Sequence, residues 1–344
     1  FIPLPAATFA SATVPASFTA AVRTGRRVAA DLTRRWVERF PASDDGWLAH
    51  AEALELSGDL SRAAPGIARI EEALARVQTT SLTPAMRLRT ETLGVRLAVR
   101  AGALAEARTR ARAVLADTAF RRDSSLTRTL APLAAFVGDT SWLEATMDEL
   151  RAPDLPRALS DALARYHARA VLGLCDGLAA DRTQMMRLFV SSVPEADTAR
   201  VRAQAIVSAD RSAVPCLGVG AMDPMSLSGS AVDDALRALS RRDTTAALRA
   251  LRSLGTTRAG AADGSISWDE LYLEVWTTRA LGDSVTAVNR LIRAFEGLGE
   301  VSSLTFGFTS QAAGLRRAVD LFDQLSEHRR GDPDVARWRR AIVE

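Results

Sequence analysis

Few side chains in this 344-residue sequence are of the types that do chemistry. Its three histidines, His50, His167 and His328, lie far apart, and none is four residues from another, the spacing that would put two zinc ligands on one helix face. The glycine-rich fragment Gly218-Val219-Gly220 lacks a phosphate-binding sequence after it, and the chain contains no lysine to contact a phosphate. We therefore expect no catalytic residue, no metal and no cofactor, and predict that the protein is not an enzyme.

The two cysteines, Cys175 and Cys216, leave two interpretations open. No Cys-x-x-Cys pair occurs, so neither a zinc site nor a haem attachment is indicated. The cysteines could form one disulfide if the protein lies outside the cytoplasm. The alternative, which we favour from the sequence alone, is that they are two unrelated small core residues.

Charge is spread evenly along the chain. All 44 basic residues are arginines, and 41 acidic residues are interspersed with them, which is typical of solvated helix faces rather than of a nucleic-acid-binding surface. No apolar run approaches the roughly 18 residues that a membrane-spanning helix needs. Alanine, leucine and arginine recur throughout, and all three favour helices. The composition therefore predicts an all-α protein that binds no nucleic acid and has no transmembrane segment in this chain.

A helix–turn–helix unit recurs along the sequence. Its clearest copy has Trp47, Leu54, Gly58, Ala63 and Ile67 as a large residue, an apolar residue, a turn glycine, a small residue and a bulky one. At these positions the chain resembles the tetratricopeptide repeat family, whose paired helices stack on one another. Further turns are predicted at Gly102, Gly138, Gly177, Arg242-Asp243, Gly282 and Gly331.

The repeats predict an α-solenoid of about seven TPR-like helical hairpins over residues 21–344, preceded by an extended arm over residues 1–20. Each helix should bury one apolar stripe, as Val28, Leu32, Trp36 and Phe40 would in the first. Two loops are expected to interrupt the solenoid. Residues 208–230 contain prolines and glycines that argue against a long helix, and residues 297–310 are apolar enough either to fold back into the groove or to contact a partner.

Stacked hairpins form a concave face suited to binding a peptide or another protein. We expect an acidic segment of a partner to contact the arginines of this face, together with apolar residues of the second loop. The predicted contact residues are Arg96, Arg100, Arg165, Arg169, Leu304, Phe306 and Phe308. The sequence thus favours a non-catalytic protein–protein interaction scaffold, an accessory or structural subunit of a larger complex that could be membrane-associated.

Two alternatives remain. The segments 277–283 and 335–343 are similar to the C-terminal repeat regions of bacterial membrane-tethered serine/threonine kinases. That resemblance implies a regulatory or ligand-sensing repeat domain of a longer bacterial signalling protein, without kinase activity, because no kinase motif is present. The second alternative is an enzyme with a site in the groove. A periplasmic or membrane-peripheral location is favoured over a cytoplasmic one.

Overall fold

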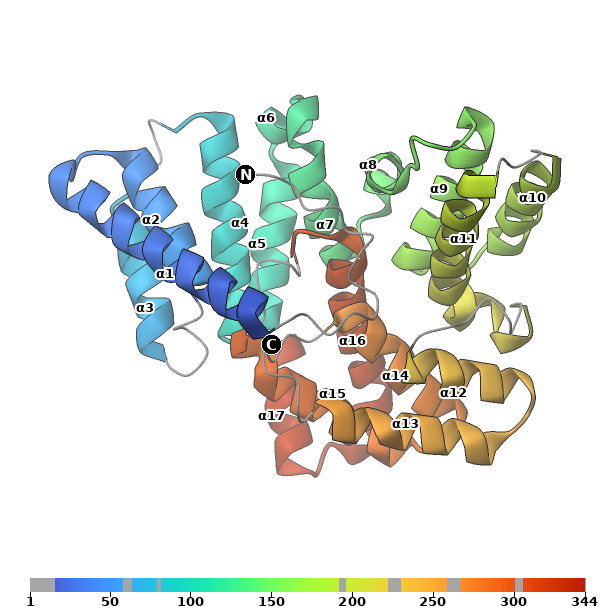
Figure 1. Ribbon diagram of the computed structural model, residues 1–344. Helices are drawn as coiled ribbons and strands as arrows, with labels where there is room; N and C mark the ends of the chain where they lie inside the picture. The colour runs from blue at the N-terminus through green and yellow to red at the C-terminus, as the bar shows by residue number, and fades with distance from the viewer. Residues whose placement is uncertain are drawn as a thin grey trace.

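The computed structural model describes residues 16–57, 64–78, 82–191, 196–221, 230–258, 267–300 and 306–343. Every regular element within these ranges is a helix, and they contain no strand (Figure 1). The predicted all-α class is therefore confirmed.

Two of the predicted turns combine a glycine and an aspartate with separate roles, while the turn predicted at Gly58 lies outside the described residues. Gly138 and Gly282 take φ angles of +76° and +85°, a left-handed conformation that ends a helix without a Cβ clash. The following residues, Asp139 and Asp283, accept a backbone amide hydrogen bond at the start of the next helical segment. Arg242 adopts φ +60° at the one predicted turn that lacks glycine. These turn positions are confirmed.

The helices form three groups that meet at α16 (Thr309–Ser326), which lies at the centre of Figure 1. In the first group, consecutive helices pack mainly as neighbours, with α2 on α1 and α3, α4 on α5, and α5 on α7. This group comprises α1 (Ala16–Arg39), α2 (Asp44–Leu56), α3 (Ala64–Ala75), α4 (Pro84–Arg100), α5 (Leu104–Ala116), α6 (Thr118–Arg121) and α7 (Thr127–Val137).

In the second group, α9 packs against α8, α10 and α11, and in the third, α14 packs against α12, α15 and α16. The second group comprises α8 (Leu143–Leu150), α9 (Arg157–Leu172), α10 (Leu178–Ser191) and α11 (Ala196–Leu217). The third comprises α12 (Ala231–Ser240), α13 (Thr244–Arg258), α14 (Trp268–Ala280), α15 (Ser284–Glu296), α16 and α17 (Pro333–Val343).

The C-terminal helices return to the middle of the chain. Helix α16 packs on α7 and α9, and α17 packs on α5, so segments far apart in sequence lie side by side. The main core fills this junction, and its aromatic side chains pack around Phe295, which contacts Phe322 edge-on at 5.2 Å and Trp338 at 5.3 Å between ring centroids. Consecutive hairpins pack together. Because α16 and α17 return to α5, α7 and α9, however, the described helices do not form a single open superhelix.

Helices α14 and α16 approach most closely at Gly314. A Cβ placed there would lie 2.4 Å from the backbone nitrogen of Asp269, a contact that only a shift of one helix could relieve. We expect Gly314→Ala to lower the free energy of unfolding by about 1–3 kcal/mol, measured by urea denaturation. Gly331→Ala is the control, because a Cβ at Gly331 meets nothing within 4 Å. Equal losses for the two variants would contradict the close approach.

Both predicted loops and the arm need correction. Helix α11 continues to Leu217, so the argument against a long helix at residues 208–230 was wrong. Pro215 lies in the last turn of α11, where it cannot donate the helical hydrogen bond to the carbonyl of Arg211, and the helix ends two residues later at Leu217. Residues 222–229 lie outside the described residues, as do 301–305 of the second loop and 1–15 of the arm. Residues 16–20 of the predicted arm belong to α1.

Candidate protein-binding surface

The outer face of α1 carries a row of exposed apolar side chains. Val28, Leu32, Trp36 and Phe40 follow one another at steps of four residues and are 50%, 59%, 41% and 54% exposed. Phe40 comes directly after α1, and its amide still donates to the carbonyl of Trp36, so it continues the helical row. We call these four residues the α1 stripe. The prediction that they are buried was wrong.

The reason lies in which side of α1 faces its neighbour. Val37, which is 4% exposed, packs inward, and the Thr33 hydroxyl lies 3.0 Å from Nδ1 of His50 on α2. Thr33 and Val37 point about 80° and about 120° away from the centre of the stripe, because successive helical residues are offset by about 100°. The apolar residues of α1 therefore face two sides; α2 covers the side of Val37 and, of the stripe, contacts the ring of Trp36, which lies beside Gly46.

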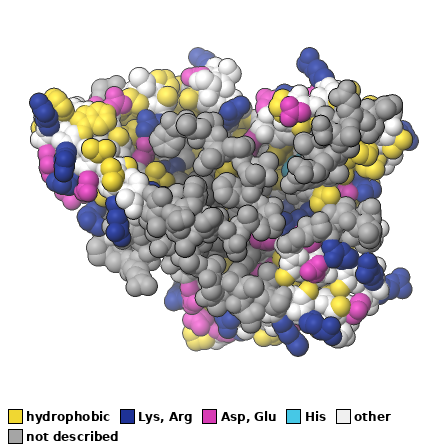
Figure 2. All heavy atoms as spheres, in the orientation of Figure 1, with side chains coloured by type: hydrophobic (Ala, Val, Ile, Leu, Met, Phe, Trp, Pro, Cys, Tyr) yellow, Lys and Arg dark blue, Asp and Glu magenta, His cyan; other side chains and the backbone are white. Residues whose placement is uncertain are grey.

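The α1 stripe is the only row of its kind in the described part of the chain. Its members are four of the seven large apolar residues that are exposed there, and the other three are scattered, at Val190, Val285 and Phe308. Single exposed apolar side chains are ordinary on a protein surface, whereas a contiguous row marks an interface. Figure 2 shows hydrophobic and charged side chains gathered at the end of the molecule where α1 and α2 meet.

A cleft of about 500 Å³ lies on the other side of α1, between α1, α2 and α3. Charged and aromatic side chains line it, among them Arg27, Asp31, Arg34, Trp47, His50 and Glu72. Burial, and secondarily the positive charge of Arg34, lower the pKa of His50 against the opposing effect of Glu38, so its imidazole is neutral at pH 7. No cluster of three metal-ligating side chains occurs among the described residues.

Two of the predicted partner contacts, Arg96 and Arg100, already bind a carboxylate of their own chain. Glu55, whose side chain is 1% exposed, lies 3.0 Å from Arg96 and 3.5 Å from Arg100. Burial lowers the pKa of Arg100, and Glu55 opposes this shift. The sequence reasoning missed Glu55, although it lies seven residues after the buried Leu48 and four after the buried Ala51, on the inward face of α2.

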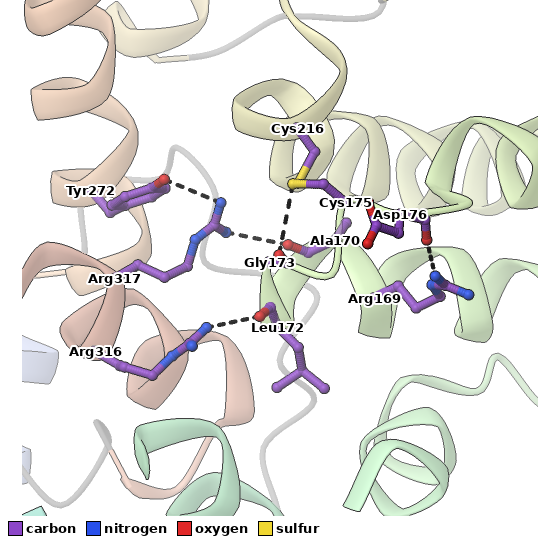
Figure 3. The surroundings of a disulfide bond; sticks show 10 residues. All are labelled: Arg169, Ala170, Leu172, Gly173, Cys175, Asp176, Cys216, Tyr272, Arg316 and Arg317. Atoms are coloured by element: carbon purple, nitrogen blue, oxygen red, sulfur yellow. Dashed lines mark hydrogen bonds between the residues drawn. A yellow bond between two sulfur atoms is a disulfide. The ribbon is translucent and has the colours of Figure 1, made fainter. Parts of the chain in front are cut away.

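The other two predicted arginines lie on α9. Arg169 forms an ion pair with Asp181 at 3.3 Å and donates to the carbonyl of Asp176 (Figure 3). Arg165 is exposed and has no ion-pair partner among the residues that the structure describes. The predicted arginines are thus divided between two groups of helices, and three of the four have partners within the chain.

The apolar residues predicted as partner contacts in the second loop also differ in their exposure. Phe306 is 4% exposed and packs edge-on against Phe136 of α7, with 5.2 Å between ring centroids. Phe308 is 41% exposed, and Leu304 lies outside the described residues. The sequence left open whether this loop folds back into the protein or contacts a partner. Phe306 is buried in the protein, whereas Phe308 is exposed.

Cys175 and Cys216 form a disulfide, so the favoured interpretation of two unrelated core residues was wrong. The bond ties the turn after α9 to the last turn of α11 (Figure 3). Beside it, Arg316 and Arg317 of α16 donate to the last carbonyl groups of α9, at Leu172 and Ala170. Cations are favourable at a helix C-terminus, and these contacts hold α9 against α16.

A second buried polar cluster lies between α9, α10 and α11. The hydroxyl of Tyr166 donates to Asp210 at 2.7 Å, and Arg182 donates to both oxygens of the same carboxylate. Burial, and then the hydrogen bond to Asp210, raise the pKa of Tyr166, so the phenol stays protonated as a donor. A phenol, a carboxylate and a guanidinium that satisfy one another connect helices and leave no group free to act on a substrate.

The helices of the described ranges include none with the length and apolarity required to cross a membrane. Comparison of the chain with protein-family models, with curated proteins and with solved structures finds no match.

Proposed function

We propose that this chain is a non-catalytic helical scaffold that binds another protein through the α1 stripe. The observation that carries the proposal is the row Val28, Leu32, Trp36 and Phe40, which keeps about half of each side chain exposed. Leaving such a row in water costs about 25 cal/mol per Å² of apolar surface, and a partner that covers the row recovers that free energy.

The helical hairpins support a TPR-like scaffold as part of this proposal. The left-handed glycine, the capping aspartate and the packing of consecutive hairpins are what a stacked helical repeat requires. Among the described elements α1 has α2 as its main neighbour, so the side of α1 that carries the stripe is open to a partner.

The disulfide supports the location proposed with this function. Disulfides persist in oxidising compartments and are rare in the reducing cytoplasm of most cells. The Cys175–Cys216 bond therefore favours a periplasmic or membrane-peripheral protein, which fits an accessory subunit of a membrane-associated complex.

The alternative of a ligand-sensing repeat domain is favoured by a different observation. The cleft between α1, α2 and α3 has a volume of about 500 Å³, within the range of small-molecule sites, and its lining is about evenly divided between polar and apolar surface. Most such sites are lined mainly by apolar and aromatic side chains. We therefore place this alternative second.

Purification of the chain from its own cells in mild detergent tests the scaffold. We expect a companion protein in constant stoichiometry with the wild type, and its loss from a Leu32→Asp variant, which puts a charge in the middle of the stripe. Val190→Asp is the control, since Val190 is 79% exposed and lies on α10, remote from α1. A wild-type chain that purifies alone would contradict the scaffold and bring the sensor alternative forward.

A further inference from the structure

The α1 stripe also contains information on the kind of partner it binds. Its four residues span about 18 Å along the helix, at 1.5 Å per residue, which matches three to four turns of a second helix. Side chains at steps of four form the ridge that enters the groove between the side-chain rows of a neighbouring helix. The shape of the stripe therefore suits a second helix that lies along α1.

Positive charge predominates on α1. Between residues 24 and 40 there are five arginines and two carboxylates. Both carboxylates, Asp31 and Glu38, are used by Arg34, at 4.0 and 2.6 Å. Arg26, Arg27 and Arg35 form no ion pair with any residue that the structure describes.

Two of the arginines lie directly beside the apolar row. Arg35 comes three residues after Leu32, and Arg39 three residues after Trp36, which makes each pair neighbours on the helix surface. The guanidinium of Arg39 also lies 5.7 Å from the ring centroid of Phe40. A partner that covers the apolar stripe would therefore also contact the guanidinium groups of Arg35 and Arg39 beside it.

We infer that the partner of the α1 stripe is an amphipathic helix of another protein, with acidic residues flanking its apolar face. This inference rests on the proposed function and names the partner's chemistry. Carboxylates on the partner helix pair with Arg35 and Arg39, while its apolar face covers Leu32 and Trp36. A second copy of this chain docked through the same face would set arginines against arginines, which is unfavourable.

An anionic membrane would offer the same charge as an acidic helix. An interfacial helix, however, buries its apolar face about 5–10 Å into the lipid. The four stripe residues are 41–59% exposed, and the ring of Trp36 reaches the first turn of α2 beside Gly46, so part of the row already lies against the protein. A ridge this shallow fits the groove of a helix better than the interior of a bilayer.

Three fluorescent synthetic peptides test the inference by anisotropy with the full chain. Two share leucines at helical spacing and carry either glutamate or lysine beside them, and the third is the acidic peptide with its leucines scrambled. We expect the acidic amphipathic peptide to bind at least about tenfold more tightly than the other two. Leu32→Asp should weaken this binding about tenfold or more, and Val190→Asp should leave it unchanged.

A charge reversal separates the electrostatic contribution from the apolar one. In an Arg35→Glu/Arg39→Glu double variant, the preference should shift from the acidic peptide to the basic one. Equal affinity for both peptides in the wild type would overturn the inference. So would binding only to vesicles of phosphatidylcholine and phosphatidylserine, or a dimer in sedimentation, if either were abolished by Leu32→Asp.

The two proposals fail separately. If a companion protein co-purifies and Leu32→Asp releases it, but no acidic peptide binds, then the scaffold stands and the inferred partner class is wrong. If neither a companion nor a peptide binds, both are wrong.

Discussion

Replacing Glu55 with alanine is expected to lower the free energy of unfolding by about 3–5 kcal/mol. The carboxylate is almost fully buried between Arg96 and Arg100, and the side chain of Arg100 is itself 6% exposed. Removing Glu55 leaves the Arg100 guanidinium buried without a counter-charge, which costs far more than the loss of an exposed pair. Urea denaturation followed by far-UV circular dichroism measures the difference.

The chain provides a matched control one helical turn away. Glu52 also lies on α2 and also binds an arginine of α4, Arg89, but its side chain is 24% exposed and that of Arg89 is 48% exposed. We expect Glu52→Ala to cost no more than about 1 kcal/mol. Similar losses at the two positions would show that burial does not set the cost of breaking these pairs.

A double variant tests the same ion pair even if the Glu55→Ala variant does not fold. Replacing both Glu55 and Arg100 with methionine removes the two most buried charges together and leaves only Arg96, whose side chain is 14% exposed. Replacing a buried ion pair by apolar residues is often neutral or stabilising. We therefore expect the double variant to recover most of the stability lost in Glu55→Ala. If it is less stable than the single variant, the pair is not the source of the effect.

Substitution of Glu55 also tests which surface binds the partner. If Arg96 and Arg100 contacted an acidic partner, as the sequence suggests, removing their internal carboxylate would leave them freer to bind it. If the partner occupies the α1 stripe, a Glu55→Gln variant that remains folded should bind the acidic amphipathic peptide with unchanged affinity.

The local features of the fold are predictable from the sequence because their causes are local. Gly138-Asp139 and Gly282-Asp283 each combine a residue that tolerates positive φ with one that caps the next helix. Such a pair specifies the end of one helix and the start of the next without reference to the rest of the chain. The all-α class follows from the same kind of information.

Which face of a helix is buried is not a local property. Periodicity detects the apolar row from Val28 to Phe40 but cannot show that α2 approaches from the side of Val37. A helix with two apolar sectors needs two neighbours to bury both, and α1 packs mainly against one. The apolar periodicity that predicts a buried side for α1 thus falls on residues that are exposed in the structure.

The partners of charged residues are equally hard to predict. Arg96 and Glu55 are 41 residues apart and meet only because α2 packs against α4. The return of α16 to α7 likewise depends on contacts between segments that no repeat spacing relates. These long-range contacts decide whether an arginine is available to a partner, which is why the predicted binding residues and the exposed stripe do not coincide.

Loss of the disulfide is expected to lower the free energy of unfolding by about 2–4 kcal/mol. Cys175 and Cys216 are separated by 41 residues, and closing a loop of this length restricts the unfolded chain considerably. The measurement compares urea denaturation of the wild type with that of a Cys175→Ser/Cys216→Ser variant. Cys175 is exposed and Cys216 half-buried, so serine introduces no deeply buried hydroxyl at either site.

Reductant distinguishes the bond from other effects of the substitutions. Dithiothreitol should destabilise the wild type by about as much as the double substitution does, and should leave the variant unchanged. Protein purified from its own cells without reductant should show no thiol that reacts with iodoacetamide after unfolding. Two reactive thiols would contradict the disulfide and remove its support for an oxidising compartment, while the argument from the α1 stripe, which depends on neither cysteine, would stand.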